Sequence, residues 1–322
     1  MIIWTNYSED IMSLYNEGYS STEIGEILSD LHATPEVNKP RQIRRVIQSN
    51  RDRLQEIKAQ PVNHTAKILV FDIETAPHRA YVWKFWKENV GQNQVISDWF
   101  CLTWSAKWLF EDNVISAKLT PDEVKNEDDE RIVKRLWSLL DESHIVIAHN
   151  AINFDIKKIN TKFIQYNLPP PSPYEVIDTL AHAKKRFGFS SNRLNYINAV
   201  LGLEVKQDTG GFDLWARCME GDPQALINME SYNIQDVKIL EDLYLKMRPW
   251  IQPHPNVGLH VEDNVVACPA CGHNHLETCG SYNTYVNTYE ALRCKSCGAV
   301  SRSRRPITNK VKSKNIVVST PR

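Results

Sequence analysis

Apolar and polar positions change their spacing twice along the chain, and these changes divide it into three parts. Residues 1–60 show the three- and four-residue spacing of amphipathic helices. Across residues 67–250 short apolar runs alternate with longer helical patterns, which predicts one α/β domain large enough to hold its own core. Three prolines in residues 249–255 interrupt this pattern, and short alternating runs typical of strands follow in residues 263–305.

The middle part begins with a strand that the sequence predicts to be buried. Its apolar run, residues 67–74, ends in two acids, Asp72 and Glu74. Because side chains alternate between the two faces of a strand, both carboxylates point the same way. Two like charges at that distance repel each other and lose hydration on burial, so we expect a cation between them.

The same part supplies two more acids. The elements predicted after the first strand include helices in residues 131–143, 153–167 and 225–247 and a short buried strand in residues 144–150. Asp155 falls near the start of the second helix, and Asp236 lies in the third, one turn after Tyr232. Each acid alone would more often be structural. The four together favour a site for a hard divalent cation such as Mg²⁺ or Mn²⁺.

The segment of residues 1–60 predicts a helix, a turn at Gly18, a second helix after the cluster Ser20–Thr22, and a third helix. This order is that of a helix-turn-helix module, and five arginines fall in the third helix: Arg41, Arg44, Arg45, Arg51 and Arg53. A helical bundle that packs against the next domain explains the pattern equally well, because the segment is net acidic.

Three short segments carry a family resemblance. DIET, HNAINFD and YNIQD, which contain the four acids, resemble the three exonuclease motifs of the DEDD superfamily, whose members have a ribonuclease H-like fold. The Y-x-x-x-D form of the third segment resembles the tyrosine subclass (DEDDy). The stretch of residues 72–109 is similar to phage-encoded exonucleases that end in a zinc ribbon. The resemblance covers residues 67–305 and implies an α/β domain with a mixed sheet flanked by helices.

The resemblance also implies roles for individual residues. Asp72, Glu74 and Asp236 would bind the catalytic Mg²⁺ or Mn²⁺ ion. Asp72 would bridge to a second ion, which Asp155 would hold. Tyr232 would position the attacking water. With the same motifs, Asn150 and Phe154 would shape the pocket for the 3′ nucleotide.

Other residues near these motifs are expected to be structural. We expect His149 to be a packed, hydrogen-bonded histidine and Asp178 to support the fold beside the site. Five tryptophans could stack on bases, but we expect most of them in the core and at most one or two near the substrate groove: Trp83, Trp86, Trp99, Trp104 and Trp108.

Two CxxC pairs in residues 263–305 predict a second metal site. Cys268, Cys271, Cys294 and Cys297 supply four thiolates, and a tetrahedral set of four sulfurs suits one structural Zn²⁺ ion. A redox dithiol would need only one such pair. Residues 263–305 are therefore predicted to form a zinc ribbon.

Charge is distributed unevenly along the chain. The net charge of the whole sequence is −1, but residues 251–322 hold nine Lys and Arg against four Asp and Glu, a net of +5. The basic tail, residues 306–322, contains no acid. A basic end suggests a polyanionic partner. No apolar run reaches the ~18 residues of a membrane span, so no span is expected. The N-terminus lacks the pattern of a signal peptide and the cysteines favour metal binding over disulfides, so we expect an intracellular protein, with the phage resemblance implying a bacterial host.

Together these observations predict a metal-dependent 3′–5′ exonuclease that releases nucleoside 5′-monophosphates, preferably from single-stranded DNA, in phage DNA replication, repair or degradation. No polymerase motifs follow the domain, so any proofreading would serve a polymerase in trans. An exoribonuclease is an alternative, since the tyrosine subclass acts on both polymers. A second alternative is a nucleic-acid-binding protein without catalysis, which the complete set of four acids disfavours.

Overall fold

The structure is a computed structural model that describes residues 64–205, 211–262 and 264–320, residues 17–32, and ten further positions before residue 60. It divides the chain into two compact units. The first comprises Met1–Asp52 and Lys67–Tyr244, and the second comprises Arg53–Ala66 and Leu245–Arg322.

A five-stranded mixed sheet forms the centre of the first unit, in the order β5-β4-β1-β6-β7. The strands are β1 (Ile68–Thr75), β4 (Cys101–Trp108), β5 (Ile115–Lys118), β6 (Ile145–Ala148) and β7 (Glu175–Asp178). β1 pairs antiparallel with β4 and parallel with β6, and β6 pairs parallel with β7. The central position of β1 explains its apolar run, because a strand with two neighbours and covered faces is buried along most of its length. The predicted α/β domain with a mixed sheet is confirmed.

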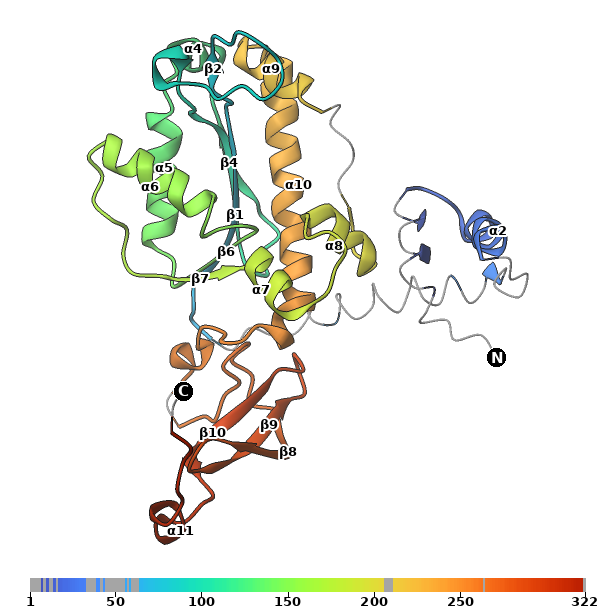
Figure 1. The fold of residues 1–322 in the computed structure, drawn as a ribbon, viewed down its shortest axis with the longest axis vertical. Coiled ribbons are helices and arrows are strands. Elements are labelled where there is room, and N and C mark those ends of the chain that lie inside the picture. The colour runs from blue at the N-terminus through green and yellow to red at the C-terminus, as the bar shows by residue number, and fades with distance from the viewer. Residues whose placement is uncertain are drawn as a thin grey trace. The chain divides into compact units, whose positions relative to one another are not determined.

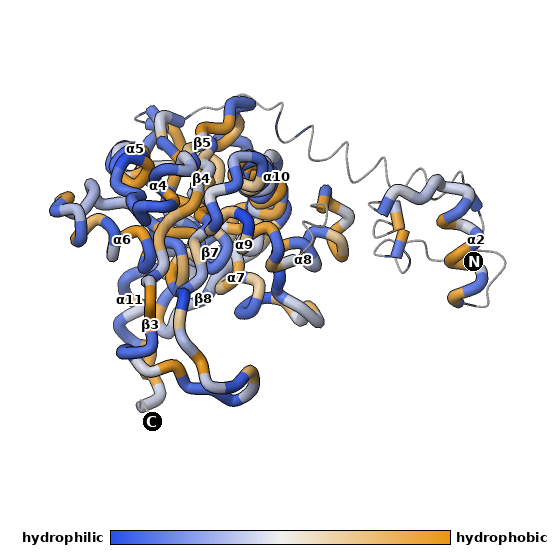
Figure 2. The backbone as a smooth tube through the Cα atoms, turned by 90° about the horizontal axis from the view of Figure 1, so that it is seen from above, coloured by the Kyte–Doolittle hydropathy of each residue, from blue (hydrophilic) through white to orange (hydrophobic). Residues whose placement is uncertain are grey.

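Helices cover both faces of this sheet. Figure 1 shows α5 (Glu130–Asp141) and α6 (Asp155–Gln165) on one side and the long helix α10 (Pro223–Met247) on the other. The shorter helices are α4 (Pro121–Asn126), α7 (Thr179–Arg186), α8 (Leu194–Val200) and α9 (Asp213–Met219). Hydrophobic positions concentrate along the central strands, β4 among them (Figure 2). Buried residues of β1, β4, α5, α6, α9 and α10 belong to one core cluster.

The burial of the tryptophans differs from the prediction. Trp104 is fully buried, and its indole N–H donates to the carbonyl of Ile132 over 2.7 Å. Trp99 and Trp108 are half-buried, and Trp83 and Trp86 are 93% and 83% exposed, so the expectation that most of the five lie in the core was wrong. Trp83 and Trp86 lie between β2 (Arg79–Ala80) and β3 (Val95–Ser97), two strands that pair with each other and, in the described part of the chain, with no other strand. Their side chains therefore gain no cover from the central sheet.

In the N-terminal region the structure describes one complete helix, α2 (Ser21–Leu31). Ser20 caps it, because the Ser20 hydroxyl accepts from the backbone N–H of Glu23 and the Glu23 carboxylate accepts from the N–H of Ser20. Four apolar side chains form a small buried cluster: Ile11, Ile24, Leu28 and Ile43. The five arginines of the expected third helix lie outside the described residues, and the helix-turn-helix module stays a prediction.

The second unit is built on a three-stranded antiparallel sheet in the order β10-β9-β8. Its strands are β8 (Leu276–Asn283), β9 (Thr288–Cys294) and β10 (Val300–Pro306), and α11 (Lys310–Lys314) follows. Short 3₁₀ turns at Arg248–Trp250 and Val257–His260 precede the sheet, and a third, Gln92–Gln94, lies in the first unit. The buried cluster of this unit contains the four cysteines of the CxxC pairs with Ala270 and Ala299. Among the described residues, no helix is both long and apolar enough to cross a membrane.

Candidate functional site

The end of β1 carries the first two acids of the candidate site. The strand is buried up to Phe71, whereas Asp72 and Glu74 are half-buried and Ile73 between them is buried. This alternation follows from the two-residue repeat of a strand, which places Ile73 in the core and both carboxylates on the opposite face. As predicted, the two acids share one side of the strand.

Helix α10 brings the third acid to the same place. Asp236 is only 5% exposed, and its carboxylate lies with those of Asp72 and Glu74 in a group whose candidate ligand oxygens are all within 4.8 Å of one another. Three carboxylates that close form a set of hard oxygen donors suited to a divalent cation. Their mutual repulsion would be relieved by such an ion.

Asn233 is a member of the site that sequence reasoning missed. Its side-chain amide donates a hydrogen bond of 2.6 Å to Oδ2 of Asp72, and the residue is fully buried. Asn233 precedes Asp236 by three residues, so the two share one face of α10. The sequence shows only that an asparagine lies one turn before Asp236, and its contact with Asp72 becomes visible only in the structure.

Asp155, the fourth acid, is placed next to the group rather than within it. It is 1% exposed and begins α6, and its Oδ1 accepts from the backbone N–H of Ile73 over 3.4 Å. Among the described residues, no hydrogen-bond partner lies near its buried Oδ2. Burial raises the pKa of Asp155 to about 7, and the charge of Asp178 adds to the effect. A buried carboxylate oxygen beside three other carboxylates fits a second cation position.

The loop before α6 is fixed by Asp178. The carboxylate of this residue accepts from the backbone N–H groups of Asn150 and Ile152, each over 3.1 Å, and it also caps α7. Asn150 has a φ of 78°, a left-handed conformation that asparagine tolerates better than most residues. Asp178 thus has the structural role expected of it, and it sets the course of the chain from Asn150 to Asp155.

His149 is likewise structural. Nδ1 lies 2.8 Å from the hydroxyl of Thr179, and Nε2 lies 2.9 Å from the carbonyl oxygen of Asn192. Both ring nitrogens are therefore engaged within the fold, as expected.

Tyr232 is half-buried on α10, four residues before Asp236. The ring of Trp215, from α9, meets it edge to face with centroids 6.1 Å apart and an angle of 78° between the planes. Such a contact restricts the tyrosine ring to few orientations. Trp215 is a second residue that the sequence analysis did not consider.

Phe154, directly before Asp155, takes part in a basic and aromatic cluster. The ammonium of Lys158 lies 5.8 Å from the centroid of the Phe154 ring and 3.8 Å from that of Trp99. Both rings are half-buried. Next to Asp155, a lysine and two aromatic rings can bind a nucleotide, because the lysine can contact a phosphate and the rings can stack on a base.

The second unit holds the four-cysteine cluster, formed by Cys268, Cys271, Cys294 and Cys297. Its four Sγ atoms lie within 4.8 Å of one another, with 3.7 Å between Cys268 and Cys297 and 3.6 Å between Cys271 and Cys294. A disulfide would require ~2.05 Å, and all four cysteines are free. Tetrahedral zinc with bonds of ~2.3 Å implies sulfur separations of ~3.8 Å. The four residues therefore fit one Zn²⁺ ion.

Comparison with known proteins identifies part of the first unit. Residues 108–248 match the model of the family RNase_H_2, described as RNase_H superfamily. These residues include Asp155, Tyr232 and Asp236, whereas Asp72 and Glu74 lie before them.

Two similar proteins are polymerases. A stretch of 139 residues is 30% identical to the DNA polymerase III PolC-type of Ureaplasma parvum serovar 3 (strain ATCC 700970), and the match covers 41% of this chain but only 9% of that polymerase. The family B DNA polymerase of the hyperthermophilic archaeon Pyrobaculum calidifontis matches with a TM-score of 0.44 and 14% identity, over 62% of this chain and 26% of that one. Together with the mixed sheet, the family match, which spans less than half of the chain, supports an RNase H-like fold for residues 108–248.

Proposed function

We propose that the protein is a metal-dependent 3′–5′ exonuclease of the DEDDy type, acting preferably on single-stranded DNA. The observation that carries this proposal is the convergence of Asp72, Glu74 and Asp236 within 4.8 Å, with Asn233 fixing the first of them. The match to a segment of a DNA polymerase supports DNA as the polymer. An exoribonuclease with the same site is the second candidate.

The four acids would together provide ligands for two metal ions. Asp72, Glu74 and Asp236 would hold one Mg²⁺ or Mn²⁺ ion, and Asp155, together with Asp72, would hold another. When bound, such ions supply the positive charge that polarises the scissile phosphate and stabilises the leaving oxygen. The buried Oδ2 of Asp155 supports its inclusion, since that atom otherwise loses hydration without compensation.

The remaining residues position the reactants. Tyr232, held by Trp215, orients the attacking water through its phenolic oxygen. The water oxygen forms a new bond to phosphorus as the bond from phosphorus to the 3′ oxygen of the preceding nucleotide breaks. The attacking water releases a proton to solvent, and the departing 3′ oxygen takes one up, so the products are a nucleoside 5′-monophosphate and a shortened strand with a free 3′ hydroxyl. Asn150 and Phe154 line the place of the 3′ nucleotide.

The second unit contributes a nucleic-acid contact. The four-cysteine cluster, with one Zn²⁺ ion, holds the ribbon together. One side of the ribbon forms a cavity of about 730 Å³ lined in part by Arg293, Arg302 and Arg304, and none of the residues described as lining it is acidic. The guanidinium of Arg302 lies 4.1 Å from the ring centroid of Tyr289. Guanidinium groups beside aromatic rings suit phosphates and stacked bases, so this surface, with the basic tail, contacts the strand.

A cleavage assay tests the proposal. End-labelled DNA and RNA oligonucleotides of one sequence, each free or blocked at the 3′ end, are incubated with Mg²⁺, Mn²⁺ or EDTA. We expect stepwise shortening of unblocked DNA from its 3′ end with either metal and no cleavage in EDTA. Asp72→Ala should abolish cleavage, whereas Asp122→Ala, which removes an exposed acid on α4, should not.

Three results would count against the proposal. Binding without cleavage in every metal would favour the non-catalytic binding protein. Shortening of RNA in preference to DNA would favour the exoribonuclease. Cleavage that survives Asp72→Ala would exclude the three-acid group as the catalytic centre. If shortening occurs as expected, a polymerase that lacks its own proofreading activity is the natural partner in trans.

A further inference from the structure

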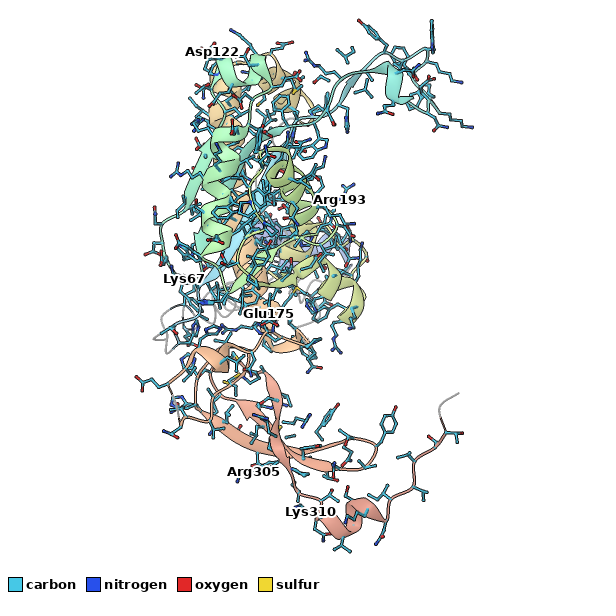
Figure 3. The ribbon with its side chains drawn as sticks, turned by 90° about the vertical axis from the view of Figure 1, so that its left-hand side faces the viewer. Lys67, Asp122, Glu175, Arg193, Arg305 and Lys310 are labelled. Carbon is cyan, nitrogen blue, oxygen red and sulfur yellow. The ribbon has the colours of Figure 1, made fainter. Side chains whose placement is uncertain are left out.

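Residues 79–97 form a separate projection, the aromatic arm. Its stem is the ribbon of β2 and β3, in which Arg79 pairs with Ser97. Above the stem, the N–H of Tyr81 donates to the carbonyl of Gln94 over 2.9 Å, and the Gln94 side chain donates back to the carbonyl of Tyr81 over 2.9 Å. Figure 3 shows this segment, in pale cyan, extending away from the body of its unit.

The tip of the arm exposes large aromatic side chains. Trp83 and Phe85 are each 93% exposed, Trp86 is 83% exposed, and Tyr81 is 74% exposed. Side chains of this size are the ones that a fold usually buries. A cluster of them on a hydrogen-bonded stem marks an interaction surface.

The charge of the arm indicates the kind of partner. Lys84 and Lys87 alternate with the aromatic residues, and Arg79 lies in the stem. The one acidic residue of the arm is Glu88. Three basic residues and one acidic residue give the arm a net charge of +2 by sequence. Arg79 is ion-paired with Glu127 outside the arm. The positive charge offered to a partner therefore comes from Lys84 and Lys87. Alternating lysines and aromatic rings are the combination that binds single-stranded nucleic acid, since the lysines meet phosphates and the rings stack on bases.

The root of the arm lies beside the candidate catalytic centre. The arm leaves the sheet where β1 ends and β4 begins, and the N–H of Ala76 donates to the carbonyl of Phe100 at that point over 2.8 Å. Glu74 is two residues before Ala76. On the returning side, Trp99 stacks against Lys158 of α6, the helix that begins with Asp155. Lys158 and Trp99 therefore extend a row of basic and aromatic side chains from the acids toward the stem of the arm.

We propose that the aromatic arm binds the unpaired bases of the substrate strand upstream of its 3′ end by stacking on Trp83, Phe85 and Trp86. This inference rests on the proposed function, because it assigns the arm to the same strand that the acids cleave. The arm holds the strand while Lys84 and Lys87 contact its phosphates. A strand shortened by one nucleotide then remains bound for the next cleavage.

A binding measurement tests the arm separately from catalysis. The wild-type chain and the double variant Trp83→Ala/Trp86→Ala are titrated into a fluorescently labelled oligothymidylate in EDTA, where cleavage does not occur. We expect the loss of two stacking rings to weaken binding about tenfold or more. The double variant Trp83→Phe/Trp86→Phe, which keeps aromatic faces, should retain most of the affinity.

Ile164→Ala provides the control, because it removes another largely exposed apolar side chain, 76% exposed, from α6. It should leave binding unchanged. Since the arm residues are exposed, the variants should keep the thermal midpoint of the wild type. A double alanine variant that binds the oligonucleotide as the wild type does would overturn the proposal. The proposal would also be overturned if the wild type self-associates, the double alanine variant does not, and both still bind the oligonucleotide. That result would assign the arm to contacts with a second copy of the chain.

The outcome is also separable from that of the proposed function. If the protein never cleaves DNA but binds it through Trp83 and Trp86, the exonuclease proposal is refuted and the proposed role of the arm is supported. If the wild type and the double alanine variant cleave DNA with equal processivity and bind it equally well, the exonuclease proposal is supported and the role of the arm is refuted.

Discussion

The amide of Asn233 donates to Oδ2 of Asp72 across 2.6 Å, joining the long helix to the end of the central strand. This bond fixes the orientation in which Asp72 faces the other two carboxylates. Groups that orient a metal-binding carboxylate in this way commonly change metal affinity or activity by ~10–100-fold when removed.

We therefore expect Asn233→Ala to weaken Mn²⁺ binding and slow cleavage by about 10–100-fold, because Asp72 loses the donor that orients it. Calorimetric Mn²⁺ titration and an end-labelled DNA assay measure the two effects. Lys238→Ala, an exposed position on the same helix, serves as the control. Unchanged Mn²⁺ affinity in Asn233→Ala would show that the hydrogen bond supports only the fold.

Metal binding should release a proton in a pH-dependent manner. Burial raises the pKa of Asp155 to about 7, so its carboxyl group is mostly protonated at pH 6 and mostly ionised at pH 8. A bound cation requires the ionised form. We expect close to one proton released per chain at pH 6 and much less at pH 8. Calorimetry in two buffers of different ionisation enthalpy counts these protons.

The variant Asp155→Asn removes the group that titrates. It should bind the cation with a proton release that no longer changes between pH 6 and pH 8. If the wild-type release were independent of pH over this range, Asp155 would not be part of the metal site.

The four-cysteine cluster should hold one metal ion that supports the ribbon. Cys294→Ser removes one of four thiolates, so we expect loss of bound zinc and rapid proteolysis within residues 264–306. Zinc content by atomic emission and limited proteolysis report the two effects. Cys279→Ser, an exposed cysteine outside the cluster, should keep one zinc ion per chain. Full zinc content in Cys294→Ser would place the metal elsewhere.

The ribbon cavity should contribute to salt-sensitive binding. Arg302→Ala removes one guanidinium from the cavity, so the slope of log affinity against log salt should fall by about one. Fluorescence anisotropy with single-stranded DNA at several salt concentrations measures this slope. Lys295→Ala is the comparison, because Lys295 is already paired with Glu277 at 3.0 Å. Equal slopes for wild type and Arg302→Ala would remove the cavity from the interface.

The sequence predicted the parts of the fold whose patterns are strong and local. The apolar run of β1, the short strand β6 and the helices α5, α6 and α10 all occur where the periodicity placed them. Such segments are well determined because burial of one face dominates their energetics. The strand order was not predicted, since pairing depends on contacts between distant residues.

The candidate site was predictable only as a set of residue types. The motifs supplied the four acids, and the fold then brought three of them within 4.8 Å and set Asp155 at their side. Asn233 and Trp215 were missed because their roles depend on partners from other elements, which spacing along one chain does not reveal. Most of the five tryptophans were expected in the core because large aromatics usually enter one, whereas no layer among the described residues covers the hairpin that carries Trp83 and Trp86.

The three converging carboxylates come from residues far apart in the chain, the first two from β1 and the last from α10. During synthesis β1 emerges early, but the ribosome must add the whole intervening domain before Asp236 appears. A nascent or truncated chain that ends before α10 therefore lacks Asp236 and cannot assemble the three-carboxylate group. Under the proposed function, a polypeptide still attached to the ribosome would be unable to degrade nucleic acid until α10 has folded against the sheet.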